Sequence, residues 1–199
     1  MYKRQVSHNG FELDKYFKTD DLKKCSRFWI ILFKTILSKL YHWKIYVVGS
    51  VEYQYPNHLF QAGYFLDKKY YDENTIDFKH LLLSEKNQSL LKDIQNSNSV
   101  GVHIRRGDYM TKQNLVIFGN ICTQKYYHDA IRIITEKVND AVFYVFSDDI
   151  SWVQTHLDIP NAVYVNWNTG ESSIYDMYLM SSCKYNIIAN STFSYWAAR

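Results

Sequence analysis

The chain has 199 residues, of which 47% are hydrophobic and 22% are charged. This balance supports a buried core and excludes a disordered chain, and the low counts of glycine (7) and proline (2) exclude collagen-like and proline-rich proteins. The formal net charge of +3 is too small for a protein that coats nucleic acid, so we expect no nucleic-acid partner.

Cysteine usage and the apolar stretches indicate the compartment. Cys25, Cys122 and Cys183 stand far apart, which predicts neither a disulfide framework nor a thiolate zinc site. The polar start of the chain lacks the pattern of a signal peptide, and the apolar stretch 28–43 is too short and too charged to span a bilayer. We therefore expect a cytoplasmic protein, with peripheral contact to the inner membrane left open.

Residues 1–99 show no regular alternation of elements. Within them, Leu22–Leu40 has apolar residues at helical spacing with lysines between them, which predicts an amphipathic helix. Packing against a core is one interpretation of this helix, and binding to a membrane surface is the other.

From Val100 onward, predicted strands alternate with predicted helices. The strands are expected at 100–104, 141–146, 162–165 and 185–189, and the helices at 124–138, 149–156 and 172–182, with another opening at Ser191. This alternation is typical of an α/β fold with a Rossmann-type parallel sheet. Because the chain stops a few residues into the last helix, we expect it to be part of a longer protein.

A pair of arginines follows the first of these strands, in His103-Ile104-Arg105-Arg106-Gly107-Asp108. Ligands of open α/β sheets bind at the carboxyl ends of the strands. Two guanidinium forks suit an anion such as phosphate, the carboxylate can fix one fork, and glycine permits a close approach. A charged loop with an internal Arg–Asp pair is the alternative.

Other polar residues are expected at the same edge of the sheet. Asp148 follows the second strand, and Asn190, Ser191 and Thr192 lie at a strand-to-helix turn, where free backbone N–H groups favour phosphate. Both segments are also compatible with simple helix caps. Asp176 stands among apolar neighbours, where a lone carboxylate needs a partner. A carboxylate accepts two donors side by side, which guanine offers and adenine does not.

Three motifs together resemble glycosyltransferase family 11, the α-1,2-fucosyltransferases, and its bacterial members in particular. The motifs are His-Ile-Arg-Arg-Gly-Asp-Tyr (103–109), Phe-Tyr-Val-Phe-Ser-Asp-Asp (143–149) and the stretch 173–196, which contains Ile-Ile-Ala-Asn-Ser-Thr-Phe-Ser-Tyr-Trp. They stand in the family's order and spacing and cover nearly all of residues 100–199. A weaker likeness extends over residues 61–70.

The resemblance implies a GT-B-like fold. Residues 1–99 would be a partial N-terminal, acceptor-side region, and residues 100–199 a Rossmann-like domain that binds the GDP-sugar and is incomplete at its C-terminus. The implied reaction is the inverting transfer of L-fucose from GDP-fucose to a hydroxyl of a galactose-terminated glycan, in α-1,2 linkage, during synthesis of surface polysaccharide or other glycans. The family requires no metal and no other cofactor.

The resemblance also implies roles for individual residues. Arg105 and Arg106 would act catalytically at the diphosphate, with Asp108 to orient them. The nucleotide would be held by His103, Asp148 and Asp176, of which Asp176 would read the guanine edge, and the terminal phosphate by Asn190, Ser191 and Thr192. The general base stays open between Asp108 and Glu171.

Two departures from the family lead to rival hypotheses. The family's opening Gly-Gly-Leu-Gly-Asn-Gln segment has no counterpart here, and Tyr195 replaces the usual tryptophan. One alternative is therefore a catalytically inactive fragment or a nucleotide-sugar-binding module of the same fold. Another is cell adhesion through Arg106-Gly107-Asp108, which the preceding buried strand disfavours because adhesive loops protrude.

Overall fold

The computed structural model describes residues 13–18, 28, 36, 46–49, 60–63 and 77–199. The chain divides into two compact units, one of residues 13–79 and the other of residues 1–12 with 80–199. The predicted helix at 22–40 lies almost wholly outside the described residues, as does most of the segment 61–70.

The smaller unit contains a short helix and a pair of strands. Helix α1 (Leu13–Tyr16) is followed by Phe17, which bridges to Phe78 with ring centroids 4.7 Å apart. Strands β1 (Tyr46–Gly49) and β2 (Phe60–Gly63) pair in parallel.

The larger unit is built on a four-stranded parallel sheet, which confirms the predicted α/β class. Its strands are β3 (Asn98–Ile104), β4 (Ala141–Ser147), β5 (Ala162–Val165) and β6 (Tyr185–Ile187), in the order β5-β4-β3-β6. The central strands β3 and β4 are buried along nearly their whole length. Their runs of β-branched and aromatic residues suit this position, because both faces of a parallel sheet are covered by helices.

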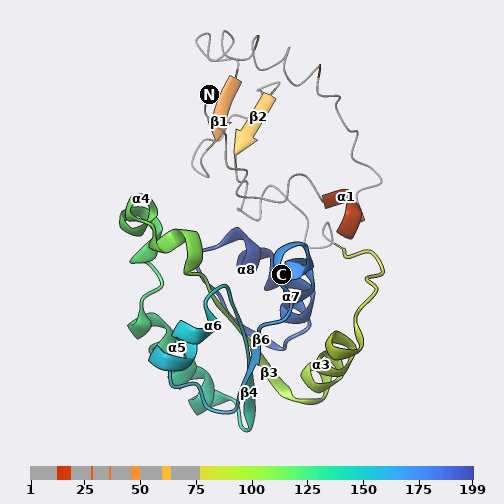
Figure 1. The fold of residues 1–199 in the computed structure, drawn as a ribbon, viewed down its shortest axis with the longest axis vertical. Coiled ribbons are helices and arrows are strands. Elements are labelled where there is room, and N and C mark those ends of the chain that lie inside the picture. The colour runs from red at the N-terminus through yellow and green to blue at the C-terminus, as the bar shows by residue number, and fades with distance from the viewer. Residues whose placement is uncertain (1–12, 19–27, 29–35, 37–45, 50–59, 64–76) are drawn as a thin grey trace. The chain divides into compact units, whose positions relative to one another are not determined.

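Helices cover both faces of this sheet (Figure 1). Helices α5 (Gln124–Lys137) and α6 (Ile150–His156) pack on one face, and α3 (Glu85–Asn96), α7 (Ser173–Ser181) and α8 (Thr192–Ala197) on the other. On β4 the division follows the alternation of side chains, since Phe143 and Val145 belong to the first core cluster and Tyr144 and Phe146 to the second.

Helix α3 was not predicted, and it moves the boundary between the units. Ser84 caps it by accepting from the backbone N–H of Asn87 at 3.3 Å, and Leu90 and Ile94 are buried against the sheet. We expected a domain boundary at residue 99, whereas the larger unit already includes His80. The reason is that α3 completes one face of the core, although few of its residues are apolar.

The strand order reverses between β3 and β6. From β3 the chain passes outward through α5 to β4 and through α6 to β5, and then returns through α7 on the other face to β6. At such a switch point the loops after two neighbouring strands leave in opposite directions and open a crevice that commonly binds ligands. In this chain those two loops contain the arginine pair and the segment Asn190–Thr192.

Candidate functional site

Arg105 lies between two carboxylates at the carboxyl end of β3. Its Nη2 donates to Oδ1 of Asp108 at 2.7 Å, and its Nη1 lies 3.0 Å from Oδ2 of Asp148. Asp108 belongs to the 3₁₀-helix η2 (Gly107–Met110), and Asp148 follows β4. The guanidinium group is therefore held both from its own loop and from the neighbouring strand.

Arg106 points toward α6 instead. Its Cζ lies 3.6 Å from the centroid of the Trp152 ring, and its Nε donates to Oδ2 of Asp149 at 3.2 Å. The other oxygen of Asp149 caps α6 by accepting from the backbone N–H of Trp152 at 3.1 Å. Within residues 77–199, no acceptor pairs with the two Nη groups of Arg106, so its fork is open to an anion.

Asp148 connects the two arginines. Its Oδ1 accepts from the backbone N–H of Arg106 at 2.9 Å, while its Oδ2 pairs with Arg105. Gly107 makes room for this arrangement, because a Cβ atom there would lie 2.6 Å from Oδ2 of Asp148. A place for Asp148 at the nucleoside and a close approach of Gly107 to a ligand stay predictions, and among the described residues both residues shape the arginine loop.

The loop after β6 is bonded to the arginine loop across the switch point. Tyr109 donates from its Oη to the backbone oxygen of Asn190 at 3.0 Å, and its ring stacks on Phe118 with centroids 5.1 Å apart. Asn190 in turn donates from its Nδ2 to the backbone oxygen of Phe118 at 3.2 Å. Phe118 belongs to the short π-helix η3 (Leu115–Gly119), which follows the single helical turn α4 (Lys112–Asn114).

His103 is buried beside the same crevice. It is 6% exposed, and its pKa is lowered to about 3, first by burial and then by the charge of Arg105, so the ring is neutral at neutral pH. The ring lies 5.0 Å from that of Phe193, in the helix that Ser191 caps and Thr192 begins. Among the described residues Nδ1 of His103 has no hydrogen-bond partner, and a buried nitrogen of this kind calls for one.

Asp176 belongs to a separate polar network on α7. Its Oδ1 accepts from Nδ2 of Asn168 at 2.8 Å, and Asn168 is paired with Asn87 of α3. Burial raises the pKa of the Asp176 carboxyl to about 7, against a smaller lowering by the Asn168 hydrogen bond. Because α7 follows β5, this carboxylate lies at the same edge of the sheet as the arginines, although no contact joins it to them among the described residues.

The structure thus joins some of the predicted site residues and leaves others apart. Hydrogen bonds and ion pairs connect Arg105, Arg106, Asp108, Asp148 and, through Tyr109, Asn190. His103, Ser191 and Thr192 lie next to this group through Phe193, and Asp176 is separate.

Several contact residues of the site were not singled out from the sequence. They are Trp152, Tyr109, Asn168 and Asn87. Asp149 belongs to the segment 146–149, which the sequence predicts either at the ligand-binding edge of the sheet or as a helix cap. A signal existed for Trp152, which stands three residues after Asp149 and so shares its face of the helix. No sequence signal shows that Asn87, far away in the chain, reaches Asn168.

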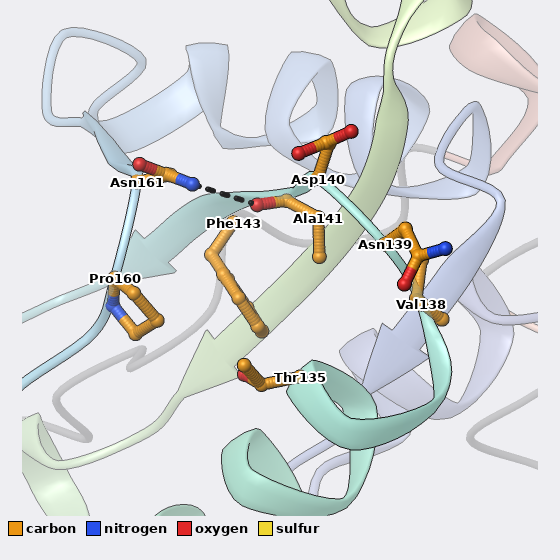
Figure 2. A pocket seen from close by; sticks show the side chains of 8 residues that line it. All are labelled: Thr135, Val138, Asn139, Asp140, Ala141, Phe143, Pro160 and Asn161. Atoms are coloured by element: carbon orange, nitrogen blue, oxygen red, sulfur yellow. Dashed lines mark hydrogen bonds between the residues drawn. The ribbon is translucent and has the colours of Figure 1, made fainter.

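A different hollow, of about 410 Å³, lies at the opposite edge of the sheet, where β4 and β5 begin (Figure 2). Asp140 and Asn161 shape it with φ angles of 50° and 48°, and Asn161 donates to the backbone oxygen of Ala141 at 3.4 Å. Its lining includes Thr135, Phe143 and Pro160 and contains no lysine or arginine. Because it lacks a cation, this hollow is a poor match for a phosphate ligand.

Within the described ranges, no three His, Cys, Asp or Glu side chains gather as a metal site. No helix found there has the length and apolar character needed to cross a membrane.

The parallel sheet, with its switch point between β3 and β6 and an arginine pair at its carboxyl edge, defines a class: α/β proteins in which ligands commonly bind at the ends of the parallel strands. The sequence pattern named "Glycosyl transferase family 11" matches residues 14–199. The chain belongs to this family, as the motifs of the sequence indicated.

Curated relatives include an alpha-1,2-colitosyltransferase of Escherichia coli, which is 32% identical over 99% of this chain and 74% of that protein. The O-antigen biosynthesis glycosyltransferase WbnK of Escherichia coli is 46% identical over 52% of this chain and 35% of that protein. A galactoside alpha-(1,2)-fucosyltransferase 2 of Pongo pygmaeus is 29% identical over 60% of this chain and 37% of that protein. The matches therefore span between about a third and three quarters of the relatives' lengths.

Among solved structures, the chain is similar to NodZ alpha-1,6-fucosyltransferase soaked with GDP-fucose. The match has a TM-score of 0.38 and 17% sequence identity, and it covers 62% of this chain and 42% of that chain. At this level it adds nothing to the assignment of individual residues.

Proposed function

We propose that the chain forms the donor-binding part of an inverting fucosyltransferase, which moves L-fucose from GDP-fucose to a hydroxyl of a galactose-terminated glycan in α-1,2 linkage. The observation that carries this proposal is the hydrogen bond from Tyr109 to Asn190, which joins the arginine loop to the segment Asn190–Thr192 across the switch point. The names of the family's other members, which include a fucosyltransferase and a colitosyltransferase, support the class of sugar.

In this proposal the arginines bind the diphosphate. When the acceptor oxygen attacks the anomeric carbon of fucose, the bond from that carbon to the phosphate oxygen breaks and its electron pair leaves with GDP. Arg105 and Arg106 meet the charge that grows on the leaving oxygens, so they stabilise the transition state more than the bound substrate. Asp108 and Asp148 hold Arg105 in place beforehand, and Ser191 and Thr192 supply further donors.

The nucleoside would occupy the side of the crevice near His103 and Asp176. Guanine has a ring N–H and an exocyclic amine side by side, and both can donate to one carboxylate. Asp176 offers such a carboxylate, because only Asn168 donates to it among the described residues. The buried Nδ1 of His103 is a second group that a nucleoside could satisfy.

The acceptor hydroxyl loses its proton during the proposed reaction. We expect the proton of the acceptor hydroxyl to pass to a carboxylate, for which Asp108 and Glu171 are the two candidates, and proximity to the donor supplies a further part of the rate. The acceptor would belong to a surface polysaccharide or another glycan. Peripheral contact with a membrane that carries the acceptor is part of this proposal.

The test is to incubate the 199-residue chain, and a longer parent if one is found, with GDP-fucose and lactose and to detect fucosyllactose by mass spectrometry. A colitose donor is offered in parallel, because one relative is named a colitosyltransferase. Calorimetry with GDP reports donor binding separately. We expect product from fucose and tight binding of GDP.

The outcomes separate the proposal from its alternative. Binding of GDP without transfer by either protein identifies the alternative, a nucleotide-sugar-binding module of the same fold. Absence of GDP binding overturns the proposal.

A further inference from the structure

Two asparagines form a hydrogen-bonded chain that runs from α3 to the Asp176 carboxylate. Asn87 on α3 donates from Nδ2 to Oδ1 of Asn168 at 2.9 Å, and Asn168 donates back from Nδ2 to Oδ1 of Asn87 at 3.1 Å. The same Nδ2 of Asn168 donates to Oδ1 of Asp176 at 2.8 Å. Two amides that bond to each other in both directions fix each other's plane.

This reciprocal pair determines which atom of Asn168 faces the carboxylate. If the Asn168 amide were turned over, its oxygen would face the carboxylate oxygen and both bonds to Asn87 would be lost. Trp167 strengthens the pair, because its Nε1 also donates to Oδ1 of Asn87, at 2.7 Å. Asn87 is 1% exposed, so its polar atoms have no alternative partner in solvent.

The network leaves one edge of the Asp176 carboxylate open. In the described part of the chain, Oδ2 accepts from no side chain and Oδ1 accepts only from Asn168. A carboxylate has about four lone-pair sites, so two neighbouring acceptors stay available in a fixed plane. Two parallel donors on a planar ligand match this edge, and a carboxylate that could rotate would match it less well.

We propose that Asn87 and Asn168 are positioning residues that fix the plane of the Asp176 carboxylate. They thereby set the preference for guanine, which presents two donors side by side to that carboxylate, over bases that present only one. This inference rests on the proposed function, since it presumes a guanine nucleotide. It adds a contribution of α3, an element that lies before the family's three motifs in the chain.

The electrostatics of Asp176 agree with this role. Burial raises the pKa of its carboxyl, and the Asn168 hydrogen bond opposes the rise because it favours the ionised form. The charged residues of the neighbouring elements, Lys86 on α3 and Glu171 beside α7, are not among the causes of the shift. Loss of the Asn168 donor should therefore move the pKa of Asp176 further up.

The experiment measures the affinities of GDP and of inosine diphosphate, which lacks the exocyclic amine, between pH 5.5 and 8.5 (roughly the span over which a carboxyl of this pKa titrates). We expect the native chain to prefer GDP by about tenfold or more, as for a hydrogen bond to a charged group. The preference should grow as Asp176 ionises. In Asn168→Ala and Asn87→Ala it should fall severalfold, and its pH midpoint should move upward.

Asn96→Ala is the matched control, because this exposed residue of α3 bonds only to the helix's own Lys92, at 2.9 Å. It should keep the native preference and midpoint. Asn168→Ala keeps the proposal testable if the buried Asn87→Ala variant does not fold, since Asn168 is only half-buried.

Each outcome has a separate meaning. A general structural defect would weaken both nucleotides equally at every pH and leave the midpoint in place, which would overturn the positioning role. Variants that retain the native ratio and midpoint would overturn it as well. A native chain that binds GDP and inosine diphosphate equally would refute the guanine assignment itself.

Discussion

The Arg106 side chain has three kinds of contact at once. Its face lies on Trp152, its Nε donates to Asp149, and its two Nη groups have no partner among the described residues. Arg105 differs, because both of its Nη groups already face carboxylates. Neighbouring arginines of the same motif thus combine one fixed cation with one open fork, and only the open fork can gain a bidentate contact without losing another.

We predict that Arg106→Ala abolishes transfer and weakens GDP binding by about 2 to 4 kcal/mol, the cost of a lost charge-assisted contact. Calorimetry with GDP measures the loss. Arg132→Ala is the control, because this exposed arginine pairs with Glu136 on α5, further along the helix than Tyr127, which contacts His103, and its removal should leave the affinity unchanged. An unchanged GDP affinity in Arg106→Ala would argue against a phosphate at this site.

Asp176 gives a prediction for stability against pH. Its pKa in the folded chain is raised to about 7, whereas an unfolded chain has about 3.9, so the folded state binds more protons between these values. The contribution of Asp176 to the free energy of unfolding therefore decreases as the pH rises from about 4 to about 7. His103 acts in the opposite direction, because its lowered pKa makes stability increase between about pH 3 and 6.5.

Asp176→Asn isolates the first of these contributions. We expect the variant to be more stable than the native chain at pH 8 and to lose that advantage at pH 4, as measured by urea unfolding at both values. The same variant should show a smaller preference for GDP over ADP. Parallel stability curves for the two proteins across this range would contradict the raised pKa.

At this scale the sequence was informative about residue types but not about partners. It predicted anion chemistry at Arg105 and Arg106 because guanidinium forks suit phosphate, with a charged loop and an internal Arg–Asp pair as the alternative. It did not show that Asp148 binds the arginine loop, because residues 105 and 148 meet only after β3 and β4 have paired. Contacts across strands depend on register, which local sequence does not contain.

At the scale of elements, α6 supports the arginine loop. It begins at the carboxyl end of β4, is capped by Asp149, and presents Trp152 to Arg106 and to His156, whose ring stacks on the indole with centroids 4.5 Å apart. One helical turn thus supplies both the carboxylate and the aromatic face that hold the guanidinium group.

We predict that Trp152→Leu lowers the affinity for GDP by up to about 2 kcal/mol, since a cation–π contact of this kind is worth about 0.5 to 2 kcal/mol. Trp152→Phe keeps an aromatic face and should restore part of the loss. Circular dichroism controls for the helix content of both variants. If leucine and phenylalanine weaken binding equally, the stacked ring has no special role and the effect is one of packing.

Elements were predicted well wherever the hydrophobic pattern was strong. The strand at 162–165 has the predicted bounds, and the helix at 124–138 ends one residue earlier than predicted. Helix α3 was missed because its apolar face is narrow, with Leu90 and Ile94 as its buried apolar residues and Asn87 as a buried polar one. A helix whose buried face includes an amide does not show the usual apolar period.

At the scale of the whole molecule, the candidate site belongs to the larger unit. It contains the switch point, the arginine loop and the Asp176 network, all within residues 80–199. The acceptor contacts expected in residues 1–99 fall mostly outside the described residues, so acceptor choice is predicted from family membership and not from geometry.

Divalent cations offer a test of the proposed role of the arginines. A departing diphosphate needs positive charge, which many enzymes take from a metal ion. Here the carboxylates of the crevice that would otherwise attract a cation, Asp108, Asp148 and Asp149, are each bonded to an arginine, so they serve to fix guanidinium groups. We therefore expect EDTA to leave the rate of fucosyl transfer unchanged, and added Mg²⁺ or Mn²⁺ not to increase it. If EDTA abolished the transfer rate and Mn²⁺ restored it, a metal ion and not the arginines would supply the positive charge.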